Sequence, residues 1–279
     1  MSKPVKCFIV EGEDRDYRFI QDMSSVFFKG RYELVTIFLA AEQNIYMLYN
    51  RLKEDDFETD LIEILREENK QAEEALTGID RQDIDEVYLM FDYDIHQRNL
   101  SEDEDPNDVL EKMLQFYNNE TENGKLYISY PMVEALYDYQ DGYCEPYSDC
   151  RYPIARIAQY KQMSGMNNPH ASHHLKKYEE WKMILSVYGL RIQCLFDVER
   201  LDYQFYRNSV TVESIFHKQR KYIDADQTVF ILSAFPEFLL DYFKPDFWAK
   251  HVNRHKKKFE NCPKEQQKPA VIQATVPQA

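Results

Sequence analysis

Glycine is scarce in this chain, with 7 glycines among 279 residues, and no Gly-x-x-x-x-Gly-Lys-[Ser/Thr] motif occurs. A P-loop ATPase is therefore excluded, because it needs that glycine-rich loop to cradle phosphates. No hydrophobic run approaches 18 residues, so we expect no membrane span. The opening MSKPVKCFIVEG also lacks the long hydrophobic stretch and the cleavage site of a secretory signal. These absences predict a cytoplasmic protein.

Cysteine is also sparse, and the 5 cysteines form no Cys-x-x-Cys pair. An odd, scattered set predicts free thiols in a reducing cytoplasm. The spacing of His170, His173 and His174 allows two of them on one face of a helix. Because no cysteine or acidic residue accompanies them nearby, we expect no zinc site there. Cys144 and Cys150 have no second pair of cysteines or histidines to complete a zinc site, so we expect no zinc there either.

Positive charge is in deficit, with 34 Lys and Arg against 49 Asp and Glu and a net charge of -15. This deficit argues against a generally basic nucleic-acid-binding protein. It is uneven, since residues 1–150 hold 14 basic and 36 acidic side chains and residues 151–279 hold 20 and 13. The second half is therefore the better place for an anionic ligand. Solvated acidic helices over residues 54–85 account for part of the imbalance.

Hydrophobic runs and helical periodicity alternate through the first half of the chain. Strands are predicted at residues 5–10, 32–40, 86–91 and 125–129. Helices are predicted between them, one of which extends to about residue 77. This order predicts an α/β fold with a TOPRIM-like, mostly parallel sheet flanked by helices. We assign it to a domain at residues 1–150, with a helical insertion at about 42–80.

Helical patterns dominate after about residue 150. Residues 151–262 are predicted to form a mainly helical region that contacts substrate or partner. A helix is expected to begin after Asn168-Pro169, because proline is favoured in a first helical turn. Residues 228–235, TVFILSAF, fit either a short strand or the buried start of a helix. The polar, proline-punctuated residues 263–279 are predicted to be a flexible tail.

Acidic residues follow three of the predicted strands. Glu11 ends the first strand, Asp92 and Asp94 end the third, and Glu134 comes shortly after the fourth. In an open α/β sheet, ligands bind beyond the carboxyl ends of the strands. Converging carboxylates need a cation, and hard oxygen ligands suit Mg²⁺ or Mn²⁺. Asp16 is a candidate for a second metal, although an acid in a first helical turn also interacts favourably with the helix dipole.

Three blocks of the sequence, IVEGEDRDYRFI, VYLMFDYD and YISYPMVEALYDY, together resemble a TOPRIM domain over about half of the chain. They are most similar to TOPRIM nucleases of bacterial anti-phage defence: the RloB-like group, OLD-type nucleases and the nuclease subunit of the PARIS system. RloB-like chains share a Glu-Gly turn with an acid five residues on, here Glu11 and Asp16. They also share Phe-Asp-x-Asp, here with Asp92 and Asp94, and Ser-x-Pro-x-x-Glu, here ending in Glu134.

The resemblance implies a magnesium- or manganese-dependent endonuclease that cleaves phosphodiesters in DNA or RNA, tRNA included. Asp92, Asp94 and Glu134 would hold the metal, and Asp16 would hold a second one. Glu11 would be either a further ligand or the general acid or base. The resemblance also implies a toxin-like effector of anti-phage defence with a separately encoded ATPase as its partner, and it leaves a homo-oligomer open.

Two departures from the family pattern keep other functions open. The fuller TOPRIM pattern has a third acid where this chain has His96, and Asp14 competes with Asp16 for the role of the acid after the Glu-Gly turn. The main alternative is a non-catalytic TOPRIM module that binds nucleic acid or a partner. The other is a HAD-type phosphatase, although that fold usually carries its Asp-x-Asp on the first strand.

A nuclease also needs a cationic surface, because phosphate neutralisation dominates the affinity for nucleic acids. Tyrosines between residues 137 and 152 would either stack on bases or, as we expect, fill the junction between the two halves. The candidate nucleic-acid-binding residues are Lys176, Lys177, Lys218, Arg220, Lys221, Lys256, Lys257 and Lys258.

Overall fold

The computed structural model describes residues 3–39, 44–54, 56–94, 100–101, 103–138, 150–167, 174–243 and 245–251. Within these ranges, no helix combines the length and the hydrophobicity needed to cross a bilayer. The predicted tail at 263–279, the histidines at 170 and 173 and the lysines at 256–258 lie outside the described residues.

One five-stranded sheet occupies the centre of the fold. Its order is β2-β1-β3-β5-β4, and all neighbours are parallel except β4, which runs antiparallel to β5. The mostly parallel sheet predicted from the alternating pattern is therefore confirmed. The strands are β1 (Val5–Val10), β2 (Glu33–Phe38), β3 (Ile84–Asp92), β4 (Asn118–Asn119) and β5 (Gly124–Ser129).

Helices connect the parallel strands, as a parallel sheet requires. Three of them, α2 to α4, lie between β2 and β3 in the sequence. The elements of this half are α1 (Arg15–Phe27), α2 (Ile45–Glu54), α3 (Leu61–Glu68), α4 (Lys70–Ala75), η1 (Arg81–Asp83), α5 (Pro106–Phe116) and η2 (Val133–Tyr137).

The helix expected to run to about residue 77 is instead two helices that meet at Asn69. Asn69 has an extended backbone, and its side chain accepts hydrogen bonds from the N–H groups of Gln71 and Ala72 at the start of α4. Its amide also donates to the carbonyl of Phe38 at 2.6 Å. The break therefore caps α4 and ties it to the end of β2.

The second half is mainly helical, as predicted, with one small addition. A short antiparallel pair, β6 with β7, forms a second sheet. Residues 228–235 contain both predicted alternatives, a strand followed by the start of a helix. The elements are β6 (Arg151–Pro153), η4 (Ile154–Arg156), α6 (Ile157–Asn167), α7 (Tyr178–Phe196), α8 (Tyr203–Ser209), α9 (Val212–Asp226), β7 (Thr228–Phe230), α10 (Ala234–Tyr242) and α11 (Pro245–His251).

The helix expected to begin after Asn168-Pro169 begins later, at Tyr178, and residues 174–177 before it are not helical. The reason is tertiary. The backbone N–H of Leu175, a buried residue, donates to the Asp22 carboxylate at 2.7 Å. The Leu175 carbonyl accepts from the Trp181 indole at 2.7 Å. These bonds hold the segment against α1 in a non-helical conformation.

Helices α1 and α10 pack together on one face of the sheet. The ring of Phe238 in α10 contacts Phe8 of β1, Tyr88 of β3 and Tyr127 of β5 at centroid distances of 5.6, 4.7 and 5.9 Å. Phe235 contacts Phe19 of α1 at 5.5 Å. The second half thus completes the hydrophobic core of the first.

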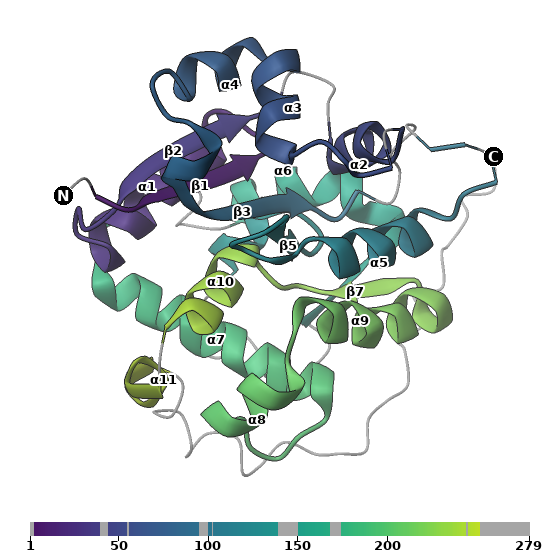
Figure 1. The fold of residues 1–279 in the computed structure, drawn as a ribbon. Coiled ribbons are helices and arrows are strands. Elements are labelled where there is room, and N and C mark those ends of the chain that lie inside the picture. Colours follow the sequence, from purple (N-terminus) through teal and green to yellow (C-terminus); the bar gives the residue numbers. More distant parts are fainter. Residues whose placement is uncertain are drawn as a thin grey trace.

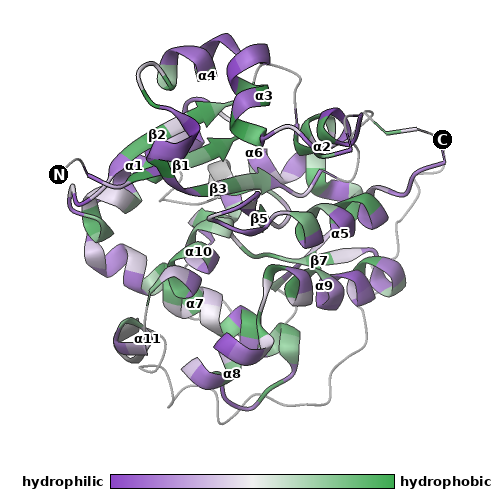
Figure 2. Cartoon of the chain, viewed as in Figure 1, coloured by the Kyte–Doolittle hydropathy of each residue, from purple (hydrophilic) through white to green (hydrophobic). Residues whose placement is uncertain are grey.

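The layers are visible in the ribbon views. Figure 1 shows α3 and α4 beyond β2, with α7 to α11 on the opposite side of the sheet. In Figure 2 the central strands β1 and β3 are mostly hydrophobic, whereas α5 and α9 alternate between hydrophobic and hydrophilic residues. This pattern is typical of helices that turn one hydrophobic side toward a sheet and the other side toward water.

Candidate functional site

Glu11 and Asp92 meet at the carboxyl end of the sheet. Glu11 directly follows β1 and Asp92 is the last residue of β3, the parallel neighbour of β1. The backbone N–H of Asp92 lies close enough to the Glu11 carboxylate to lower its pKa, whereas the charge of Asp94 raises it. The sequence-predicted acids of the first and third strands therefore share one edge of the sheet.

Asp16 joins this cluster from the first turn of α1. It is buried, and its Oδ2 accepts a hydrogen bond from the Gly12 N–H at 3.0 Å. The charge of Asp16 raises the pKa of both Glu11 and Asp92. Asp14, the competing residue, is exposed and its side chain makes no cap hydrogen bond to α1. The structure thus brings Asp16, and not Asp14, to the acidic edge.

The turn between β1 and α1 has room only for glycine. A Cβ atom at Gly12 would lie 2.4 Å from Asp16 Oδ2. No side chain fits at that distance unless the carboxylate moves away. The Glu-Gly dipeptide therefore has a steric reason: the absence of a Cβ lets the Asp16 carboxylate approach the backbone beside Glu11.

The carboxylates in this cluster bind protons more tightly than free ones. Burial, followed by the charges of Asp94 and Asp16, raises the pKa of Glu11 to about 7. Burial raises the pKa of Asp16 to about 6, and burial with the charges of Asp16 and Glu11 raises the pKa of Asp92 well above its usual range. The cluster is short of positive charge, a property expected of both a cation site and a site that holds a proton.

Asp92 is fixed by the segment that follows β5. Its Oδ1 accepts from the Val133 N–H at 2.7 Å, at the start of η2. Glu134, the next residue, is buried and forms an ion pair with Arg15 of α1. The Asp94 carboxylate accepts a hydrogen bond from the Asn44 amide at 3.4 Å. Glu134 therefore lies next to the cluster, but its charge is already paired.

Two cations border the cluster and were missed by the sequence reasoning. Arg15 pairs with Glu134 and also lowers the pKa of Asp16. Lys161, an exposed residue of α6, lowers the pKa of Glu11, Asp16 and Asp92. Arg15 lies within the first sequence block, directly before Asp16. Lys161 is in a stretch without any motif, and only the packing of α6 against η2 brings it near.

The donor chemistry of the cluster fits a hard divalent cation. All of its acidic side chains offer carboxylate oxygens, the ligands that Mg²⁺ and Mn²⁺ prefer. Among the residues that the structure describes, no three His, Cys, Asp or Glu side chains are already grouped closely enough to hold a metal ion. Metal binding here would thus require the carboxylates to draw closer together.

The predicted nucleic-acid-binding residues differ in their surroundings. Lys176 and Lys177 are exposed just before α7, and Lys221 is exposed on α9. Lys218 lies over the Phe196 ring at 5.5 Å. Arg220 is surrounded by carboxylates, with ion pairs to Asp108, Asp224 and Asp105 at 2.8, 3.4 and 3.9 Å. Its charge is therefore less available to a phosphate than that of its neighbours.

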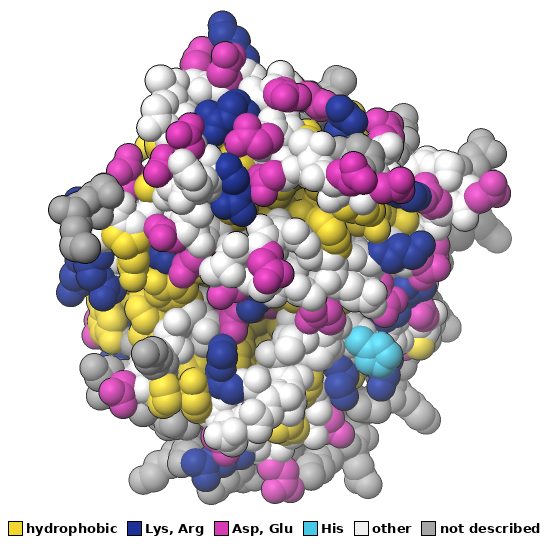
Figure 3. All heavy atoms as spheres, viewed as in Figure 1, with side chains coloured by type: hydrophobic (Ala, Val, Ile, Leu, Met, Phe, Trp, Pro, Cys, Tyr) yellow, Lys and Arg dark blue, Asp and Glu magenta, His cyan; other side chains and the backbone are white. Residues whose placement is uncertain are grey.

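The described residues on the face seen in Figure 3 form no single basic groove. On the face seen in Figure 3, acidic and basic side chains are interspersed. Of the tyrosines predicted near the junction, Tyr137 packs against Phe19 at 5.3 Å and Tyr152 against Tyr160 at 4.9 Å, and both are buried. These two fit the packing interpretation, and Tyr139, Tyr143 and Tyr147 lie outside the described residues.

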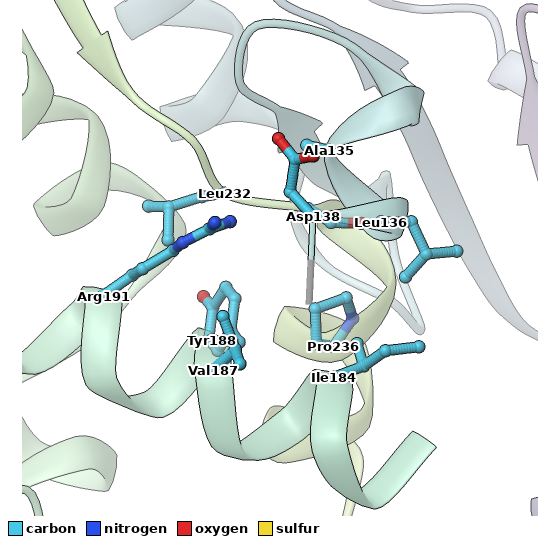
Figure 4. A pocket seen from close by; sticks show the side chains of 10 residues that line it. Ala135, Leu136, Asp138, Ile184, Val187, Tyr188, Arg191, Leu232 and Pro236 are labelled. Carbon is cyan, nitrogen blue, oxygen red and sulfur yellow. The ribbon is translucent and has the colours of Figure 1, made fainter. Parts of the chain in front are cut away.

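A small cavity lies behind η2, between it and α7. Arg191 and Asp138 lie on opposite sides of it (Figure 4). Arg191 donates to the Ile231 carbonyl at 3.0 Å, and Asp138 accepts from the Tyr160 hydroxyl. The free space of about 10 Å³ is close to that of one water molecule. It is too small for a substrate.

No protein-family model, curated protein or solved structure matches this chain. The TOPRIM resemblance therefore rests on the three sequence blocks and stays a prediction.

Proposed function

We propose that this protein is a divalent-metal-dependent nuclease that hydrolyses phosphodiester bonds of nucleic acid. The observation that carries the proposal is the meeting of carboxylates from the β1–α1 turn and from the end of β3 at the carboxyl edge of the sheet. There the charge of Asp16 raises the pKa of Glu11 and of Asp92, and the charge of Glu11 raises the pKa of Asp92. Ligands of open α/β sheets bind at this edge. The anti-phage role, the ATPase partner and the cytoplasmic location belong to the same proposal and rest on the motif resemblance.

The roles of the residues follow from their surroundings. A bound Mg²⁺ or Mn²⁺ would offset the charge that builds on the phosphate and activate a water molecule. Asp92 and Asp94 would hold the ion, with Asp16 beside them. Glu11 suits a general acid or base, because its carboxylate follows β1 directly and lies at the edge of the sheet where Asp92 ends β3. Lys161 is placed to attract a phosphate toward the cluster.

The test uses charge-neutralising variants that preserve side-chain shape. We expect Asp92→Asn and Glu11→Gln to reduce cleavage by about 100-fold or more, the usual contribution of a positioned acid or base. Glu13→Gln is the matched control, because Glu13 is an exposed acid two residues from Glu11. Plasmid DNA, single-stranded DNA, RNA and tRNA are incubated with Mg²⁺, Mn²⁺ or EDTA. The role of a residue is refuted if its purified variant cuts as well as the wild type.

A cellular assay addresses the proposed effector role. Wild type and Glu11→Ala are expressed in bacteria, and growth, genomic DNA integrity and tRNA length are compared. We expect the wild type to slow growth and to shorten one class of nucleic acid, and the variant to do neither. Intact DNA and tRNA with unchanged growth for both proteins would argue against a toxin that acts without its partner.

One observation favours a second function, a non-catalytic module that binds nucleic acid or a protein. Glu134, predicted as a metal ligand, is paired with Arg15, and the third acid of the fuller motif is replaced by His96. Such a module would bind nucleic acid or partner but leave DNA, RNA and tRNA intact at every metal concentration. The incubation experiment described above separates the two functions.

A further inference from the structure

An exposed aromatic side chain stands beside the acidic cluster. Tyr17 directly follows Asp16 in α1 and is 44% exposed. Among the large hydrophobic side chains that the structure describes, only Met163 is equally exposed. Whereas Asp16 is buried toward Glu11, the Tyr17 ring lies at the surface. With nearly half of its surface exposed, the phenol ring is available to a ligand.

The Tyr17 ring is held in place by a second ring. It meets Phe38 edge to face, with a centroid distance of 5.8 Å and an interplanar angle of 78°. Phe38 is the last residue of β2 and pairs with Val10, the residue before Glu11. The two rings therefore lie at the same edge of the sheet as the carboxylates, one strand away from Glu11. Packing of this kind reduces the rotamer freedom that a ligand would otherwise have to restrict.

An exposed cation borders the carboxylates at this edge. The charge of Lys161, an exposed residue, lowers the pKa of Glu11, Asp16 and Asp92. A nucleotide matches this arrangement in two ways. Its phosphate needs a cation, and its base has a flat face that stacks on an aromatic ring. In a duplex that face is covered by the neighbouring base pairs. Only an unpaired nucleotide can present its base to a ring while its phosphate lies at the carboxylates.

We infer that the acidic edge takes an unpaired nucleotide, with its base stacked on Tyr17, whose ring is held edge to face by Phe38, so that the substrate class is single-stranded nucleic acid. This inference rests on the proposed function. Stacking tolerates every base, because each base has an aromatic face. Selectivity for single strands over duplexes therefore follows from the rings, with no requirement for sequence.

The structure provides a matched control. Tyr178, at the start of α7, is 42% exposed and also packs against a phenylalanine, Phe27, at 6.3 Å. Phe27 is at the opposite end of α1 from Tyr17, roughly 15 Å along the helix axis at 1.5 Å per residue. Loss of an exposed tyrosine from either site removes a similar surface, but only Tyr17 is next to the carboxylates.

The experiment measures binding separately from cleavage. Fluorescence anisotropy with labelled single-stranded DNA, single-stranded RNA and a blunt duplex of the same sequence, in Ca²⁺ to slow cleavage, is compared for wild type, Tyr17→Ala, Tyr17→Phe and Tyr178→Ala. We expect tighter binding of the single strands than of the duplex. Tyr17→Ala should weaken single-strand binding by about 5- to 150-fold, the loss of one stacked base. Tyr17→Phe and Tyr178→Ala should bind like the wild type.

The outcomes separate this inference from the proposed function. If the wild type cuts nucleic acid but Tyr17→Ala binds and cuts single strands equally well, the stacking inference is wrong and the nuclease proposal stands. If single strands bind in a Tyr17-dependent manner but nothing is cut in Mg²⁺ or Mn²⁺, the inference stands and the nuclease proposal fails. Equal affinity for duplex and single strand, or no binding at all, would overturn the inference.

Discussion

The backbone N–H of Gly12 donates to the carboxylate of Asp16 at 3.0 Å, across the turn between β1 and α1. This bond joins the end of the first strand to the first turn of the first helix. It positions one carboxylate of the cluster from the backbone of another segment, and it depends on the missing side chain at residue 12.

Gly12→Ala is therefore expected to displace Asp16. The new methyl group would lie 2.4 Å from Asp16 Oδ2, so the carboxylate must turn away and lose its bond to residue 12. We expect about tenfold or greater loss of cleavage, with a stability loss of about 1–3 kcal/mol for the overpacked turn. Cleavage rate and urea denaturation are measured beside Glu13→Ala, whose side chain is exposed. Full activity in the Gly12 variant would contradict this account of the turn.

The raised pKa of Glu11 predicts that stability falls as the pH rises. In the folded state the pKa of Glu11 is about 7, whereas the ordinary pKa of a glutamate is 4.5, so the folded state keeps a proton on Glu11 up to about pH 7. Between these values the folded state binds more protons than the unfolded chain, so the free energy of unfolding declines and then levels off above about pH 7. The contribution of Glu11 is at most on the order of 3 kcal/mol.

Urea denaturation in EDTA at pH 5 and pH 7.5 measures this decline. Glu11→Gln, which cannot ionise, is expected to show a smaller decline than the wild type, and Glu13→Gln the same decline. Millimolar Mg²⁺ should stabilise the wild type most at the higher pH, where the carboxylates are ionised. An identical pH dependence for wild type and Glu11→Gln would show that residue 11 does not titrate in this range.

The ion pair between Arg15 and Glu134 predicts a non-additive pair of substitutions. Glu134 is buried and Arg15 is partly exposed, so Arg15→Met leaves a buried carboxylate without its partner. We expect a loss of about 2 kcal/mol, between the values for exposed and buried pairs. Arg15→Met with Glu134→Gln should recover at least half of it. Urea denaturation of the four proteins in the cycle measures the coupling, and simple additivity would argue against the pair.

The anchoring of α7 to α1 is tested at Asp22. Its carboxylate accepts the buried N–H of Leu175 at 2.7 Å, and Asp22→Ala leaves that donor without its partner. We expect a loss of about 1–3 kcal/mol in the free energy of unfolding. Asp22→Asn keeps an acceptor oxygen and is expected to lose less. Equal losses for the two substitutions would mean that the hydrogen bond contributes little.

The strands and their ends were predictable because their signals are local. Val5–Val10 is a buried hydrophobic run that stops at Glu11-Gly12, and Ile84–Asp92 stops at the pair Asp92 and Asp94. In both cases the change from hydrophobic to acidic residues marks the end of the strand. The parallel order then placed Glu11 and Asp92 at one edge without any knowledge of side-chain positions.

The remaining features depend on contacts that the local sequence does not encode. The helix break at Asn69 depends on a bond to Phe38, which is 31 residues away. The late start of α7 depends on Asp22, 153 residues before Leu175. Lys161 joins the acidic edge only through the packing of α6 against η2. Local propensity favoured a longer helix in the first two cases, and tertiary hydrogen bonds overrode it.

Phe238 touches three strands whose sequences end more than a hundred residues before it. During synthesis, β1, β3 and β5 leave the ribosome long before α10 does. Until then α1 alone covers this face of the sheet, and the rings of Phe8, Tyr88 and Tyr127 lack their contact with Phe238. Translation speed and chaperone access over that interval will therefore influence how much of the chain reaches its native state.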